Sequence, residues 1–254
     1  MSMNKLIIII VLACAAVLLP AALPAQDAQE VRVPTEEDII ANTVATDSPY
    51  YYTNLMMKYE LGEEELTQLE YYYLYYGYAY QEDYQPFAEN RALDEMFNIV
   101  SGINPEQPTV GQLEAIIERG IEALEDDPFN PKVLNLMAFA YGALDDPRRE
   151  QLYYKHLTGV LGAIEMSGTG LREESPWHIL MFSHAYDMLS SMGYIYNESR
   201  IISRSVEFVP LTRKTNGIRG FYFDYSRIYQ NRPEGYSFRR DRTWQFNNLR
   251  PREY

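Results

Sequence analysis

The residue type with the clearest chemical potential is tyrosine, because eight tyrosines fall within residues 67–84. Each one combines a large ring with a hydroxyl, so such a cluster can hold a peptide or a glycan by stacking and hydrogen bonding. The same tyrosines can instead bury their rings against neighbouring helices. The sequence leaves both interpretations open. The candidate ligand-binding residues are Tyr72, Tyr76, Tyr80 and Tyr84, together with His178 from a later segment.

The three histidines do not have the spacing of a zinc site. A zinc-binding helix places two ligands on one face, typically four residues apart. His178 and His184 are six apart and therefore point to different faces of a helix. We expect His156 and His184 to be core histidines with satisfied hydrogen bonds, and His178 is the least constrained of the three. No metal and no cofactor is predicted.

Nucleophilic and acid–base chemistry have little support in the sequence. No Gly-x-Ser-x-Gly motif is present, and the single cysteine, Cys14, lies near the start of the chain. Glu173 and Glu174 could serve acid–base chemistry at a cleft, or they are solvated loop charges. The sequence therefore favours a module that binds another protein, a peptide or a glycan. The alternatives are an enzyme acting on a surface glycan or peptide, and a purely structural envelope protein.

The tyrosine stretch is predicted to be a helix. Thr67 followed by Glu70 forms a capping box at its start, and Gln85-Pro86 ends it. Gly77 lies inside this helix, where glycine costs about 1 kcal/mol relative to alanine. We therefore expect a neighbouring backbone or a large ring to pack directly against Gly77.

Rings surround almost the whole circumference of this helix, which predicts a buried central position. Only hydroxyls that escape the packing remain available to a ligand, and we expect these on Tyr72 and Tyr84.

Capping residues and apolar spacing predict most of the remaining chain as helices. Their expected ranges are 48–62, 89–100, 109–126, 130–144, 148–166 and 175–189. Ser48-Pro49 supplies the cap of the first, and the last is apolar almost all round, which is typical of a buried helix. Residues 26–47 are predicted to be an extended lead-in.

The pattern changes to β structure near the end of the chain. An antiparallel hairpin is predicted within residues 201–226, with Asn216-Gly217 as its turn and a third strand at residues 201–203. Residues 48–229 are expected to form a single domain. Residues 230–254 are predicted to be a basic tail that is either disordered or docked.

Residues 1–25 have the features of a secretory signal peptide. The apolar run over residues 6–19 is too short to span a membrane, and small residues lead to a cleavage site after Ala25. An alternative is a lipid-anchored form through Cys14, although Leu12 fits a lipobox poorly. We expect an exported protein with no transmembrane segment in the mature chain.

Charge is unevenly distributed along the chain. Residues 26–199 contain 31 acidic and nine basic residues, whereas residues 200–254 contain five acidic and 12 basic ones. The acidic majority would repel phosphates, so nucleic acid is excluded as a partner. We expect the basic end to pack on the acidic body of its own chain.

Residues 113–164 resemble tetratricopeptide repeats. Residues 123–128 match the end of a repeat's second helix, and Ala138 and Tyr141 occupy the small and aromatic positions of the next repeat. This resemblance implies a mainly α fold built as a right-handed array of stacked helical hairpins, with the β-hairpin at its end.

A second set of short motifs surrounds the tyrosine stretch and recurs late in the chain. The motifs are Pro49-Tyr50-Tyr51, Lys58-Tyr59-Glu60-Leu61-Gly62, Leu66-Thr67, Leu74-Tyr75-Tyr76-Gly77-Tyr78-Ala79, Tyr84-Gln85-Pro86 and Gly220-Phe221-Tyr222-Phe223-Asp224. They resemble domain of unknown function 4919, a family of exported proteins of Gram-negative bacteria with no assigned activity. The resemblance covers about residues 48–226 and implies the compartment and a mostly helical fold, but no catalytic residues.

Overall fold

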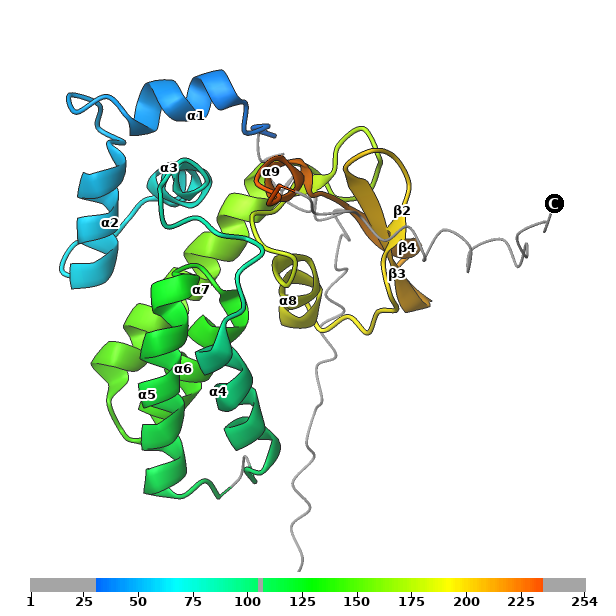
Figure 1. Cartoon of the computed structure of the whole chain (residues 1–254). Coiled ribbons are helices and arrows are strands. Elements are labelled where there is room, and N and C mark those ends of the chain that lie inside the picture. Colours follow the sequence, from blue (N-terminus) through cyan, green and yellow to red (C-terminus); the bar gives the residue numbers. More distant parts are fainter. Residues whose placement is uncertain (1–30, 105–106, 235–254) are drawn as a thin grey trace, which may run out of the picture. The chain divides into compact units, whose positions relative to one another are not determined.

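The computed structural model describes residues 31–104 and 107–234, which contain nine helices and a four-stranded sheet (Figure 1). The helices are α1 (Glu36–Thr43), α2 (Tyr52–Leu61), α3 (Gln68–Tyr78), α4 (Arg91–Ser101), α5 (Val110–Asp126), α6 (Pro131–Ala143), α7 (Pro147–Met166), α8 (His184–Ser191) and α9 (Ser226–Gln230). The strands are β1 (Trp177–His178), β2 (Arg200–Ile201), β3 (Val206–Thr215) and β4 (Ile218–Asp224). A largely helical chain with a small C-terminal sheet is thus confirmed, whereas a tetratricopeptide-like array is not. The predicted signal peptide and residues 235–254 of the predicted tail lie outside the described residues.

Helices α4 to α7 begin where side chains cap the backbone. Thr109 and Gln112 form the predicted capping box of α5, and Asn130 accepts a hydrogen bond from the Val133 amide at the start of α6. The helices pack on one another in chain order. We call their shared buried cluster the aliphatic core. It contains Met96, Leu113, Ile116, Ala123, Val133, Met137, Ala140 and Tyr141.

Helix α3 has the predicted capping box between Thr67 and Glu70. All residues from 71 to 78 are buried, so its central position is confirmed. The helix ends at Tyr78, earlier than predicted, because the Gln81 side-chain amide donates to the Gly77 carbonyl at 3.0 Å and a series of turns follows. We call the larger buried cluster around α3 the tyrosine core; it also contains Phe129 and Trp177.

Gly77 allows α1 and α2 to approach α3 closely. A Cβ atom at Gly77 would lie 3.0 Å from the Thr43 methyl carbon and 3.0 Å from a ring carbon of Tyr52. The predicted packing of a large ring against this glycine is therefore confirmed.

The N-terminal part of the described chain differs from the prediction of an extended lead-in up to residue 47. Helix α1 forms there because the Thr35 hydroxyl accepts from the Asp38 amide at 3.3 Å, and acidic residues occupy the first turn. This cap was present in the sequence, but the weak apolar pattern hid the short helix.

The predicted helix start at Ser48-Pro49 is wrong. The Ser48 hydroxyl accepts from the Tyr50 amide at 3.0 Å, which closes a turn, and α2 begins only at Tyr52. Gly62 forms the C-terminal cap of α2 with a left-handed φ of 61°, at the end of the predicted range.

The helix predicted over residues 175–189 is also wrong in its first half. Trp177 and His178 form β1, which pairs in parallel with Phe223 and Asp224 of β4, and α8 begins at His184. A short apolar run without helical periodicity fits a buried strand as well as a buried helix. Pairing with β4, which lies later in the chain, decides between the two.

The sheet has the strand order β1-β4-β3-β2. Strands β3 and β4 form the predicted antiparallel hairpin, and both Asn216 and Gly217 have positive φ, as a two-residue hairpin turn requires. Strand β2 pairs with β3 close to the predicted third strand, whereas β1 was not predicted.

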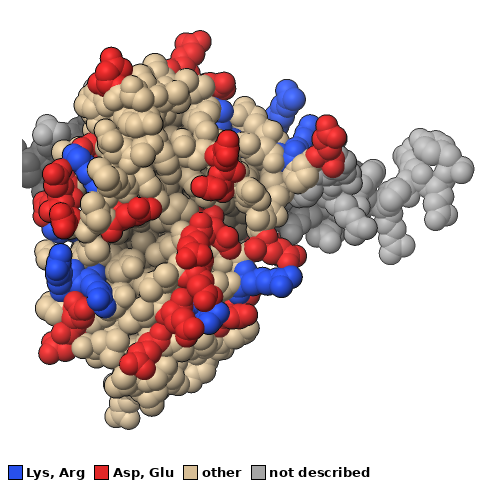
Figure 2. All heavy atoms as spheres, turned by 60° about the vertical axis from the view of Figure 1, so that its left-hand side comes forward, with Lys and Arg blue, Asp and Glu red and all other residues tan. Residues whose placement is uncertain are grey.

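Acidic side chains are spread over the helical face shown in Figure 2, with fewer basic ones between them. Within residues 31–104 and 107–234, no helix combines the length and the apolar character needed to cross a membrane.

Candidate functional site

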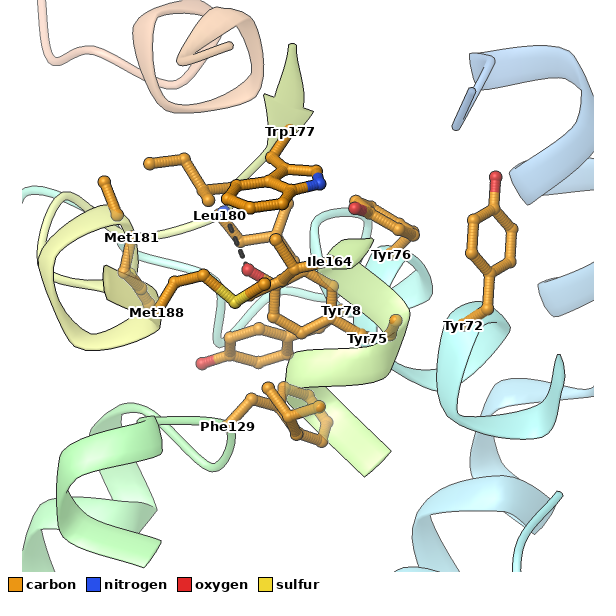
Figure 3. Packing of buried hydrophobic residues seen from close by; sticks show 14 of the residues in the cluster. Tyr72, Tyr75, Tyr76, Tyr78, Phe129, Ile164, Trp177, Leu180, Met181 and Met188 are labelled. Carbon is orange, nitrogen blue, oxygen red and sulfur yellow. Dashed lines mark hydrogen bonds between the residues drawn. The ribbon is translucent and has the colours of Figure 1, made fainter. Parts of the chain in front are cut away.

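Three tyrosine hydroxyls of the tyrosine core hold the backbone of residues 178–180. Figure 3 shows the bond between Leu180 and Tyr75 as a dashed line. Tyr76 donates to the His178 carbonyl at 2.9 Å, and Tyr84 donates to the Leu180 carbonyl at 2.7 Å. The Leu180 amide in turn donates to the Tyr75 hydroxyl at 3.1 Å. The tyrosine stretch therefore binds a segment of its own chain, and these hydroxyls are not free for a ligand.

Tyr75 also begins a buried chain of hydrogen bonds through His184. The Tyr75 hydroxyl accepts from the Leu180 amide and is also hydrogen-bonded to His184 Nδ1 at 2.8 Å. Because a carboxylate only accepts, His184 Nε2 donates to Asp127 Oδ2 at 3.1 Å. The three residue types resemble a catalytic relay, but Tyr75 is 0% and His184 1% exposed. A substrate cannot reach them, and the prediction of a core histidine is confirmed.

His156 is the second core histidine, as predicted. Its Nδ1 lies 2.9 Å from the Tyr71 hydroxyl, and its ring stacks on Tyr59 with centroids 3.8 Å apart. Burial lowers the pKa of His156 to about 4, so the imidazole is neutral at neutral pH.

The prediction that the hydroxyls of Tyr72 and Tyr84 escape the packing is wrong. Tyr72 is 0% and Tyr84 5% exposed. The Tyr84 hydroxyl is bound to Leu180, and the Tyr72 hydroxyl is buried without a hydrogen-bond partner. Figure 3 shows Tyr72 on a different side of α3 from Tyr75 and Phe129.

The structure brings two of the other candidates together. Tyr76 and His178 line one cavity of about 90 Å³, beside Asp224 and Arg227. Burial lowers the pKa of His178, and the Asp224 carboxylate opposes this effect. Ligand pockets usually measure roughly 300–1,000 Å³, so this cavity is too small for a substrate. The ring of Tyr80 lies nearby under the Arg227 guanidinium, whose carbon is 4.7 Å from the ring centroid.

A much larger hollow of about 880 Å³ opens between the β2–β3 connection and α9. We call it the arginine hollow. Its lining residues are Ile201, Ile202, Ser203, Arg204, Ser205, Glu207, Ser226, Tyr229, Gln230 and Arg232. No sequence pattern predicted this hollow, although the Ser-Arg-Ser run at residues 203–205 in the basic end of the chain was an available signal.

In the arginine hollow, the acidic group is hydrogen-bonded, but the basic groups are not paired with described acidic residues. Both oxygens of the Glu207 carboxylate accept hydrogen bonds, from the Ser199 hydroxyl at 2.5 Å and from the Tyr229 hydroxyl at 2.6 Å. The exposed side chains of Arg204 and Arg232 form no ion pair with any described residue. The hollow therefore presents two guanidinium groups that no acidic side chain of residues 31–104 or 107–234 neutralises.

A second hollow, of about 740 Å³, lies between the α2–α3 turn and α7. There most charged groups are paired, and only the exposed Arg148 among its basic side chains forms no ion pair with a described residue. Lys155 binds Glu65 across the hollow, and Arg149 lies 3.6 Å from Asp146. This hollow offers a ligand less unmatched charge than the arginine hollow.

The next two observations concern acid–base chemistry and metal binding. Glu173 and Glu174 are both exposed in a turn, as solvated loop charges are. Among residues 31–104 and 107–234, no group of three histidine, cysteine or acidic side chains is placed to hold a metal ion.

The fold and the site define a helical protein with a tyrosine core, a C-terminal four-stranded sheet and, beside that sheet, the arginine hollow. A family model, described as domain of unknown function (DUF4919), matches residues 37–234, and the chain belongs to this family. This confirms the resemblance drawn from the tyrosine-rich motifs. A search of curated proteins and a search of solved structures each find no match.

Proposed function

We propose that this protein is exported to the periplasm or the outer surface of a Gram-negative bacterium, where it acts as a binding module of the cell envelope. The apolar run and small residues within positions 1–25 support export. The arginine hollow is the binding site in this proposal, since its volume of about 880 Å³ lies in the range of small-molecule and peptide-end sites.

The observation that carries the proposal is the pair of unmatched guanidinium groups of Arg204 and Arg232. The chain has a net charge of −14, so carboxylates to neutralise them are abundant, yet none of the described ones does so. A guanidinium fork matches the geometry of a carboxylate, and the hydroxyls of Ser203 and Ser226 can hydrogen-bond neighbouring polar groups. The ligand therefore carries a carboxylate, which an acidic sugar and a peptide C-terminus both supply.

The enzyme alternative receives less support. Two candidate side chains from the sequence, His178 and Tyr76, lie beside Asp224, but the cavity there measures about 90 Å³. A purely structural role does not account for two arginines at a hollow that no described carboxylate neutralises.

Calorimetric titration of the full mature chain tests the binding site. One arm uses an oligosaccharide of uronic acids, and the other uses a short peptide with a free C-terminal carboxylate. We expect one arm to bind and the Arg204→Ala/Arg232→Ala variant to lose at least about tenfold in affinity. The matched control is Arg213→Ala/Lys214→Ala, which removes two exposed basic side chains at the hairpin tip and leaves binding unchanged. No binding in either arm, or an equal loss in the control, contradicts the proposal.

Intact-mass measurement of the protein from the producing cell tests export. We expect the mature chain to begin at Gln26. A chain that retains the leader contradicts export, and one that begins at a lipid-modified Cys14 supports export in the anchored form.

A further inference from the structure

Residues 31–35 run in an extended form along one side of α3 and lead into Glu36, the first residue of α1; we call residues 31–36 the strap. Their burial alternates: Arg32 and Pro34 are partly buried, whereas Val31 is 43% and Val33 50% exposed. In an extended chain, successive side chains point to opposite sides. The strap thus has the side-chain pattern of a bound peptide, with alternate residues directed into the protein.

Arg32 is the main anchor of the strap. Its amide donates to the Met166 carbonyl at the end of α7, at 2.7 Å. Its guanidinium donates to the Tyr73 hydroxyl at 2.7 Å and to Asp38 at 3.0 Å. The guanidinium carbon also lies 5.7 Å from the ring centroid of Tyr72 and 5.6 Å from that of Tyr73.

The rest of the strap follows the same side of α3. Pro34 lines the cavity of about 90 Å³ together with Tyr76. Glu36 pairs with Arg227 at 3.4 Å, and this arginine covers the ring of Tyr80. Tyrosines spaced three or four residues apart therefore form one groove under the strap. We call it the tyrosine groove; its members are Tyr72, Tyr73, Tyr76 and Tyr80.

The strap fills this groove but does not form a hydrogen bond with every polar group in it. The hydroxyl of Tyr72 is buried and has no hydrogen-bond partner among the described residues, whereas that of Tyr80 lies beside Arg227. A buried polar group without a partner costs about 1–3 kcal/mol. The strap is therefore an imperfect occupant, and a segment that supplies an acceptor to the Tyr72 hydroxyl binds the groove better.

We propose that the tyrosine groove is a second binding site, which recognises an extended partner segment with an arginine followed two residues later by a proline. The strap, with its Arg32-Val33-Pro34 sequence, occupies the groove in the free protein and is displaced by the partner. The groove shares no anchoring residue with the rim of the arginine hollow, so this inference does not depend on the proposed function.

A labelled peptide with the sequence of residues 31–36 tests the site by fluorescence anisotropy. The mature chain is compared with its Arg32→Ala variant, whose strap has lost its anchor. Because the strap competes with the peptide, we expect the variant chain to bind at least about tenfold more tightly than the unaltered chain. The same peptide with Arg32→Ala is expected not to bind. A Lys214→Ala chain, which is altered at the exposed tip of the β3–β4 hairpin, serves as the control and binds like the unaltered chain.

Equal binding by the Arg32→Ala and unaltered chains, or equal binding of the two peptides, overturns the proposal. Hydrogen exchange of the unaltered protein gives a test that needs no variant. The Arg32 amide is expected to exchange at least about tenfold faster than the Leu180 amide, since displacement requires the strap to open by itself. Exchange of both amides at the rate of global unfolding also overturns the proposal.

Discussion

The two buried clusters of this protein are held together in different ways. In the aliphatic core, α4, α5 and α6 pack with the next helix in the chain, mainly through aliphatic carbon and methionine sulfur. In the tyrosine core, rings supply the packing, but their hydroxyls also bond to groups far away in sequence. Tyr75 binds Leu180 and His184 in this way, and Tyr71 binds His156.

The difference teaches that equal burial does not imply an equal contribution to stability. In the aliphatic core, the cost of a substitution follows the volume that is removed. In the tyrosine core, the cost of removing one oxygen depends on whether that oxygen has a partner. Tyr72 and Tyr75 are both 0% exposed on the same helix, yet only Tyr75 has hydrogen bonds.

The largest effect is expected in the aliphatic core. Met137→Ala should lower the free energy of unfolding by about 2–5 kcal/mol, because Met137 is fully buried and a cavity remains. Chemical denaturation measures this loss. Met137→Leu keeps the volume and should cost less than about 1.5 kcal/mol. Equal losses in the two variants would show that volume does not govern this core.

The tyrosine core should respond to pH through His156. The folded-state pKa of about 4 lies below the ordinary value of 6.5, so the unfolded chain takes up the proton first as the pH falls. The stability from neutral His156 is complete above pH 6.5, and about 3 kcal/mol of it is lost between pH 6.5 and pH 4.

Denaturation of the unaltered protein and of His156→Gln at several pH values measures this pH-dependent loss of stability. Burial raises the pKa of Asp187 to about 6, so its contribution changes in the opposite direction over the same range. Only the difference between the two proteins therefore reports on His156. A difference that stays constant from pH 7 to pH 4 contradicts the prediction.

Tyr75→Phe should cost about 2 kcal/mol, since it leaves the Leu180 amide and His184 Nδ1 without a buried partner. Urea denaturation at pH 7 provides the measurement. A change below about 0.5 kcal/mol would mean that the tyrosine hydroxyls add nothing beyond ring packing.

Tyr72→Phe should have the smallest effect, within about 0.5 kcal/mol of the unaltered protein or slightly stabilising, because it removes a buried hydroxyl that has no partner. The same denaturation experiment compares Tyr72→Phe with Tyr75→Phe, which serves as its matched control. If both variants lose the same stability, hydrogen bonding does not distinguish the two sides of α3.

The two cores also differ in how well the sequence predicts them. The caps at Thr109 and Asn130 are local signals, and the helices of the aliphatic core begin where those signals stand. The conformation of residues 177–180 depends instead on hydroxyls of α3 and on pairing with β4, and no local pattern contains that information.

The candidate site was predictable only in part. Ring periodicity correctly indicated a central tyrosine helix, but not that its hydroxyls would bind the chain's own backbone. The arginine hollow forms because α9 lies beside the β2–β3 connection, which unites residues 201–207 with residues 226–232. The basic composition of this region was visible in the sequence, whereas its enclosure depended on tertiary structure.

Helix α3 and the segment that it holds lie far apart in the chain, so they are synthesised at different times. Tyr75 and Leu180 are 105 positions apart. At synthesis rates of roughly 5–20 residues per second, α3 leaves the ribosome about 5–20 s before its partner segment exists. During that interval its apolar rings have no β1 segment to cover them, which is a hazard for aggregation. In a newly made chain, α3 therefore stays partly uncovered until residues 178–180 arrive, whereas the aliphatic core can assemble as soon as α6 is complete.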